Sequence, residues 1–140
     1  MIRKLVLAAT AVVLSASATA CTIHAETPDL VIEDSSSDST LVVQWSIDGI
    51  TDDEDCFRAD AQKIQISIDD MDGIEVGTYL RSCSAFETSI SLPPGRYEAF
   101  AVMLDGDGRP RTTEVEVDPF RLYGDDSLTI PLDFPLDSFF

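Results

Sequence analysis

Basic residues and histidine are scarce in this sequence. Nine Lys and Arg residues stand against 26 Asp and Glu residues, which gives a net charge of −17 at pH 7, and there is one His in 140 residues. A chain with this charge is repelled by phosphate backbones, so we exclude nucleic acid as a partner. The apolar run at residues 5–14 is also too short to span a bilayer, because a spanning helix needs about 18 or more apolar residues.

The shortage of histidine removes the commonest catalytic arrangements. The single His24 lies in a polar segment near the start of the chain, where no rigid element would orient it. Ser-His-Asp and Cys-His catalysis are therefore excluded. Pairs of carboxylates, which glycosidases use, are uninformative in so acidic a chain, because any acidic surface supplies them. We predict that the protein is not an enzyme.

The first 21 residues have the organisation of a bacterial export signal. Arg3 and Lys4 precede the apolar run at 5–14, and the small residues at 17–20 lead directly to Cys21. This order is typical of a lipobox, so we predict a signal peptide at residues 1–20 and acylation of Cys21. The lipid would be the protein's contact with the membrane. We expect a lipid-anchored protein of the cell envelope, and Thr22 after the anchor favours the outer membrane.

An ordinary secretory signal is the alternative. Ala18-Thr19-Ala20 also fits an A-x-A cleavage site, which would release a soluble secreted protein. The chain has three cysteines, an odd number for an exported protein. If Cys21 carries lipid, Cys56 and Cys83 are left to pair, so the number of cysteines favours lipidation.

Cys56 and Cys83 are predicted to form a disulfide. Export would place them where disulfides persist, and they are the only cysteines that follow Cys21. A metal pair or a reactive thiol is the competing interpretation. Neither is supported, because the two cysteines lie far apart in the sequence and no histidine accompanies them.

Residues 21–40 are acidic and rich in serine, which is typical of a flexible tether. Leu30-Val31-Ile32 interrupts this segment and could add a short strand to the domain that follows. Because the signal peptide contains two of the nine basic residues and none of the 26 acidic ones, the mature chain would carry a net charge of −19. We expect this charge to keep the domain soluble.

From residue 41 to 140 the hydrophobic pattern has a period of two, which indicates half-buried strands. Trp45 is the predicted core anchor of the first strand, with ligand stacking as its alternative role. Residues 96–104 are apolar on both faces and suit a central strand, whereas Pro131 places the last strand at an edge or in a bulge. The pattern predicts an all-β, antiparallel β-sandwich of seven or eight strands, Ig-like or transthyretin-like. The alternating runs are 41–47, 64–68, 74–80, 86–92, 96–104, 113–117 and 128–134.

One short motif suggests a family. Residues 92–97 read Leu-Pro-Pro-Gly-Arg-Tyr, which resembles the L-P-x-G-x-Y hairpin of transthyretin-like and carboxypeptidase-regulatory-like domains. Together with Cys21, Trp45 and the cysteine pair, the layout is similar to that of small lipoproteins of predatory and social, myxobacterial-type Gram-negative bacteria. The resemblance implies binding or structural roles and no catalytic residue. An envelope protein or a polysaccharide is the expected partner.

Three acidic clusters are candidates for weak calcium binding. They contain Asp53 and Asp55, Asp70 and Asp72, and Asp105 and Asp107, all in predicted turns. Carboxylate oxygens on turns are the ligands that Ca²⁺ prefers, and a calcium-stabilised adhesion module is the alternative function. An EF-hand does not fit, because aligning Gly73 with the loop glycine puts Ile68 at the first ligand position. Solvated turns explain the clusters more simply, and we predict no cofactor.

Acylation of Cys21 can be tested directly. The exported protein should sediment with membranes, and its intact mass should include the attached lipid. Cys21→Ala should move the protein to the soluble fraction or leave the precursor uncleaved. Cys56→Ala keeps the anchor and is the control. A soluble wild-type protein that begins with an unmodified Cys21 would contradict the prediction.

Overall fold

The computed structural model describes residues 37–140. The predicted signal peptide, Cys21 and the run Leu30–Ile32 lie outside these residues. Within the described part, no helix has the length and apolar character needed to cross a membrane.

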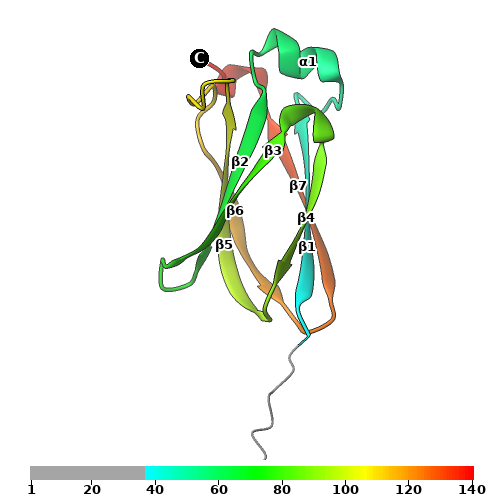
Figure 1. Ribbon diagram of the computed structural model, residues 1–140, viewed down its shortest axis with the longest axis vertical. Helices are drawn as coiled ribbons and strands as arrows, with labels where there is room; N and C mark the ends of the chain where they lie inside the picture. The colour runs from blue at the N-terminus through cyan, green and yellow to red at the C-terminus, as the bar shows by residue number, and fades with distance from the viewer. Residues whose placement is uncertain (1–36) are drawn as a thin grey trace, which may run out of the picture. The chain divides into compact units, whose positions relative to one another are not determined.

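Seven strands form two sheets that pack face to face (Figure 1), which confirms the predicted β-sandwich. The three-stranded sheet has the order β4-β1-β7, and the four-stranded sheet has the order β3-β2-β5-β6. The strands are β1 (Ser39–Ile47), β2 (Lys63–Asp70), β3 (Glu75–Ser82), β4 (Glu87–Leu92), β5 (Gly95–Leu104), β6 (Val115–Leu122) and β7 (Ser127–Phe134). The helical elements are α1 (Asp53–Arg58), η1 (Cys83–Ala85) and η2 (Leu136–Ser138).

The core lies between the sheets and follows from the alternation of the strands. In β1 every second residue from Leu41 to Ile47 is buried, and in β2 the same holds for Ile64, Ile66 and Ile68. Burying each of these large side chains contributes about 1.5–3 kcal/mol. Strand β5 pairs with both β2 and β6, so its predicted central position is confirmed.

The pairing of β1 with β7 is parallel, whereas every other strand pair of the described sandwich is antiparallel. The register runs from Thr40 opposite Ser127 to Ile47 opposite Phe134. Alternation within a strand does not reveal the direction of its partner, so the sequence pattern could not show this pairing. Strand β7 is an edge strand, as predicted from Pro131, and the other sheet also has a proline in an edge strand, Pro119 in β6.

Strand β3 presents the opposite face to the one expected. Ile74, Val76 and Leu80 were predicted to face the core, but they are 64%, 41% and 51% exposed. The side chain of Tyr79 packs against the core instead. A register shift in the pairing of β2 with β3 between Ile68 and Asp69 accompanies this change of face. Strand bounds also differ from prediction, most of all in the sixth strand, which covers 115–122 rather than 113–117.

The two ends of the sandwich differ. At the base lie the β2–β3, β4–β5 and β6–β7 turns, and at the apex lie α1, η1, the β5–β6 loop and η2 (Figure 1). The described chain enters β1 at the base. There the hydroxyl of Ser39 donates to the carbonyl of Tyr123, and the amide of Thr40 donates to the carbonyl of Asp126 over 2.8 Å.

The L-P-x-G-x-Y motif closes the base through its tyrosine. The hydroxyl of Tyr97 donates to the carbonyl of Pro93 over 2.6 Å. Its ring lies so close to Gly95 that a Cβ at that position would meet the Tyr97 hydroxyl oxygen at 3.1 Å. A side chain at position 95 would therefore require the Tyr97 ring to shift by a few tenths of an ångström, and the tyrosine supplies the hydrogen bond. Burial, followed by the charges of Asp38 and Asp70, raises the pKa of Tyr97 above its usual value of 10.0.

Tyr97→Phe tests this contact. Loss of the hydrogen bond should lower the free energy of unfolding by about 1 kcal/mol in a denaturant titration at pH 7. Because the folded-state pKa is raised, Tyr97 contributes stability below pH 10.0 that is lost as the pH rises towards its folded pKa. The variant should lack this alkaline loss. Tyr123→Phe, at a tyrosine that is 58% exposed, is the control, and equal effects of both substitutions would contradict the assignment.

Candidate functional site

A disulfide organises the apex, and it joins the two cysteines that the sequence paired. Cys56 in α1 and Cys83 in η1 have bonded sulfur atoms and Cα atoms 6.0 Å apart. Both residues are buried. The bridge closes a loop with a sequence separation of 27. Loop closure of this length stabilises the folded state by about 3.5 kcal/mol in the chain-entropy account.

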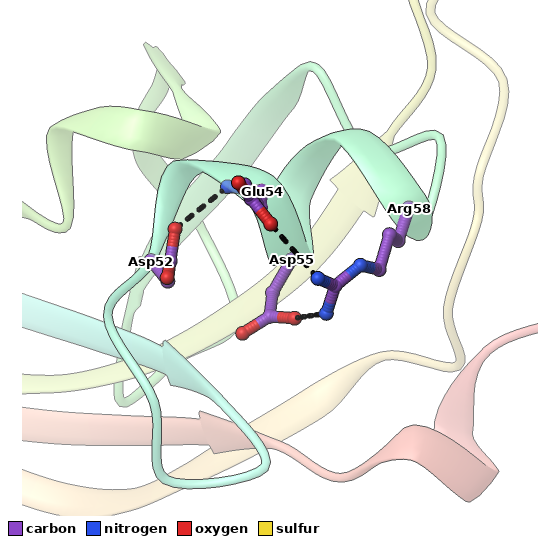
Figure 2. Close-up of polar contacts among 4 residues, drawn as sticks. All are labelled: Asp52, Glu54, Asp55 and Arg58. Atoms are coloured by element: carbon purple, nitrogen blue, oxygen red, sulfur yellow. Dashed lines mark hydrogen bonds and ion pairs between the residues drawn. The ribbon is translucent and has the colours of Figure 1, made fainter.

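Helix α1 depends on this bridge because it has only six residues. Isolated helices this short are unstable in water. Figure 2 shows its local contacts: Asp52 accepts a hydrogen bond from the amide of Glu54, and Arg58 pairs with Glu54 at 2.8 Å and Asp55 at 3.0 Å. Exposed pairs of this kind contribute about 0.3–0.5 kcal/mol each. The disulfide therefore dominates the placement of α1.

The segment after η1 is tied to β1 through Trp45. The indole nitrogen of Trp45 donates to the carbonyl of Cys83 over 2.7 Å, and the backbone amide of Trp45 donates to the carbonyl of Phe86 over 3.0 Å. Trp45 is only 1% exposed. Its predicted role as core anchor is confirmed, and its side chain is too deeply buried to stack on a ligand.

Phe86 has a strained backbone. Its φ of 54° lies in the left-handed region, which is unfavourable for a bulky side chain. Such strain costs on the order of 1–3 kcal/mol and persists only where surrounding contacts impose it. Here the contacts are the backbone hydrogen bonds of Phe86 with Trp45 and Cys83. They hold Phe86 in a position where it lines a surface hollow.

This apical hollow lies on the outer side of the three-stranded sheet, towards the apex. It encloses about 450 Å³ and is lined chiefly by Gln44, Ser46, Thr51, Phe86, Glu87 and Pro131. Across the β1–β4 pair, the amide nitrogen of Gln44 donates to a carboxylate oxygen of Glu87 over 2.7 Å. Asp133 accepts from the hydroxyl of Ser46 and from the amide of Gly49, which fixes the opposite side.

The hollow combines side chains that can form hydrogen bonds with side chains that offer apolar surface. Gln44 and Glu87 offer an amide and a carboxylate at one place, Ser46 and Thr51 offer hydroxyls, and Phe86 and Pro131 offer ring surface. A concave site with a few polar groups among apolar ones is the usual form of a small-molecule site.

Uncharged side chains continue from the hollow to the base. On the outer face of this sheet, one row pairs Ser89, Val42 and Thr129, and the next pairs Ser91, Thr40 and Ser127. We refer to these six residues, of which all but Val42 carry a hydroxyl group, as the hydroxyl strip. In a chain with 26 acidic residues, a strip without charge is a distinct surface.

The calcium candidates do not come together in this part of the chain. Asp53 and Asp55 lie in α1 rather than in a loop. Asp70 is the last residue of β2 and Asp72 lies in the base turn that follows, whereas Asp105 and Asp107 lie in the β5–β6 loop. Among residues 37–140, no three acidic, histidine or cysteine side chains are grouped so that they could hold a metal ion. Calcium binding stays an untested alternative to solvated turns.

Two of these carboxylates have local structural roles. A carboxylate oxygen of Asp70 accepts from the amides of Asp72 and Ile74, and Asp105 accepts in the same way from the amides of Asp107 and Arg109. The hydrogen bond from the Arg109 amide is the main reason that the pKa of Asp105 lies below its usual value, with the Asp107 amide and the nearby arginines adding to it. Each carboxylate shapes its own turn.

Sequence reasoning missed the hollow. Gln44 and Glu87 become neighbours only through the pairing of β1 with β4, 43 residues apart in sequence. The residue type at position 86 does not predict a left-handed backbone, since phenylalanine disfavours that conformation. Only the alternation of β1, which places Gln44 on the outer face, could have been noted in advance.

Comparison with known proteins identifies no family. No family model matches the chain, and no curated protein matches it. Several solved structures are similar at low identity, among them the following three. A candidate polysaccharide-binding protein of Bacteroides thetaiotaomicron has 16% identity and a TM-score of 0.40, with 66% of this chain and 46% of that chain covered.

The second structure, a candidate adhesin of Bacteroides ovatus, has 16% identity and a TM-score of 0.44, with 69% of this chain and 46% of that chain covered. The third, a leucine-rich repeat protein of Bacteroides thetaiotaomicron, has 12% identity and a TM-score of 0.39, with 71% of this chain and 14% of that chain covered. The chain thus spans less than half the length of each.

The role of the disulfide can be measured by replacing both cysteines. Cys56→Ala/Cys83→Ala should lower the free energy of unfolding by about 2–4 kcal/mol, because the unfolded chain regains the freedom that the bridge removes. Peptide mapping of the wild-type protein without reductant should recover one Cys56–Cys83 peptide pair. The control is Ser82→Ala/Ser84→Ala, which removes an exposed hydroxyl contact beside the bridge. Two free thiols in the exported protein would overturn the assignment.

Proposed function

We propose that this protein is a lipid-anchored envelope protein whose β-sandwich binds an uncharged polysaccharide, without catalysis, in the apical hollow. The single observation that carries the proposal is the Gln44–Glu87 pair, held at 2.7 Å beside Phe86 in a concave, solvent-open site. An amide and a carboxylate side by side can donate to and accept from sugar hydroxyls. The apolar rings next to them suit the C–H faces of a sugar.

Charge supports an uncharged ligand. The chain carries a net charge of −17, which repels anionic glycans as it repels nucleic acid. The hydroxyl strip extends the same face towards the base with uncharged side chains, five of which can hydrogen-bond. A polymer could therefore lie along the sheet, with one of its sugar units in the hollow.

The chemistry of the described residues supports binding rather than catalysis. Cys56 and Cys83 are joined to each other, so neither is a free nucleophile. Glu87 and Asp133, the two carboxylates beside the hollow, accept hydrogen bonds from neighbouring protein groups. The only histidine of the sequence, His24, precedes the described part.

The chain entry and the hollow lie at opposite ends of the domain, and this arrangement suits presentation of the hollow from a membrane. The chain enters at the base, and the hollow lies towards the apex. A tether that joins the domain at the start of β1 would be attached at the end opposite the hollow. The acidic charge would also keep the domain apart from anionic headgroups.

The proposal can be tested by titrating the purified protein with neutral polysaccharides, such as a β-glucan, an α-glucan and a mannan, with alginate as an anionic comparison. Gln44→Ala should weaken binding of the recognised neutral polymer about tenfold. This factor corresponds to roughly 1.4 kcal/mol of binding free energy, the contribution expected from the hydrogen bonds between the Gln44 amide and the sugar. Alginate should not bind.

Gln65→Ala is the matched control, because Gln65 is the same residue type on β2 of the other sheet. It should leave affinity unchanged. Equal loss in both variants, or no binding of any neutral polymer, would contradict the proposal. Binding of an envelope protein that Gln44→Ala abolishes would instead assign the hollow to a protein partner.

A further inference from the structure

Two arginines lie directly opposite each other near the base of the sandwich. Arg96 is the second residue of β5 and pairs with Arg121 near the end of β6. The next pair, Tyr97 and Phe120, faces the core, with ring centroids 6.0 Å apart. Because side chains alternate along strands, Arg96 and Arg121 share the outer face of the four-stranded sheet, where both are exposed.

This juxtaposition is unfavourable without a counter-charge. Opposite side chains in an antiparallel pair have Cβ atoms about 4.5–5.5 Å apart, and like charges there are destabilising. Within residues 37–140 the ion pairs involve Arg58, Arg109 and Arg111, and none involves Arg96 or Arg121. A chain with 26 acidic residues therefore places two of its few cations together without a carboxylate to pair them.

Tyr123 orients one of the two cations. Its carbonyl accepts from the hydroxyl of Ser39 and from the amide of Asp126, so its backbone is fixed at the base. Its ring is exposed, and the guanidinium carbon of Arg121 lies 5.8 Å from the ring centroid. A cation over an aromatic face is attracted to it, which favours this position of the Arg121 guanidinium.

From these observations we infer that Arg96 and Arg121 together bind one phosphate group. A guanidinium presents five N–H donors in a planar fork that matches phosphate oxygens. A phosphate monoester carries a charge of about −1.5 to −2 at pH 7, so a single group offsets both cations. The site lies at the base and the hollow lies towards the apex (Figure 1), so this inference does not rest on polysaccharide binding.

The acidic charge of the chain favours a small ligand. Charges more than about 8 Å away are largely screened at physiological ionic strength, so distant carboxylates oppose a phosphate in contact with two cations only weakly. A nucleic acid or a membrane surface would also meet the acidic residues around the pair, such as Glu98, the next outward residue of β5. A soluble phosphate ester is therefore favoured over a lipid headgroup as the source of the phosphate.

The test titrates the exported protein, in an uncharged detergent, with sodium phosphate and with sodium chloride at equal ionic strength. The readouts are the side-chain Nε–H signals of Arg96 and Arg121 in NMR spectra and the temperature of thermal unfolding. Phosphate should shift both signals to saturation. At ten times its Kd it should raise the unfolding temperature by about 5 °C more than chloride does.

Arg96→Gln should reverse its effect between the two conditions. Without phosphate, the variant should unfold at the same temperature as the wild type or a higher one, because a like charge has been removed. With phosphate, it should unfold at the lower temperature, because the site has been lost. Arg109→Gln is the matched control, since Arg109 is an exposed arginine that pairs with Asp107 at 3.3 Å, and it should keep the phosphate effect. Gln44→Ala should keep it too, which separates this site from the hollow.

Two results would overturn the inference. Equal effects of phosphate and chloride would show general screening only, and equal loss of the phosphate effect in Arg96→Gln and Arg109→Gln would show unspecific attraction to surface cations. A second arm, in nanodiscs of phosphatidylglycerol or of a phosphate-free galactolipid, identifies the source of the phosphate. Shifted Arg96 and Arg121 signals in phosphatidylglycerol alone assign a lipid headgroup, whereas shifts only after added phosphate assign a soluble ester.

Discussion

The hydrogen bond from the indole of Trp45 to the carbonyl of Cys83 is the contact on which the apex depends. It is buried, and a buried donor left without a partner would cost about 1–3 kcal/mol. It ties β1 to η1, and the disulfide ties η1 to α1. Through these two links, a helix of six residues and a phenylalanine with an unfavourable backbone are held in fixed positions. The hollow depends on both of these links.

The strands were predictable because their burial follows the period of the sequence. All seven predicted runs overlap with strands, although their bounds differ, and the central position of β5 followed from its two apolar faces. The prediction for the inward face of β3 failed because apolar residue type was taken as a sign of burial. At the edge of the sheet, Tyr79 covers the core, while Val76 and Leu80 remain in solvent. Helix α1 was missed because its six residues are too few for a helical period to show.

The cysteine pair could be inferred from the number of cysteines and their context, without geometry. The hollow could not, because it combines β1, β4 and β7, which meet only when the sheet is complete. Residue types in the sequence show which chemical groups the chain carries. A site made from ordinary residues such as Gln44 and Glu87 depends on register, and register is decided by the whole fold.

The place of β1 in its sheet has a consequence for the order in which the molecule can fold. Its partners, β4 and β7, both come late in the chain, and Ser46 contacts residues 86 and 87 positions away. Pairings this distant carry a large loop-closure cost and slow folding. The four-stranded sheet obtains two of its three pairings from hairpin-like neighbours, whereas the sheet that carries the hollow cannot close until the last strand has emerged. The face that carries the hollow is therefore the last part of the domain to form during synthesis, and a chain truncated before β7 would leave β1 with an open edge.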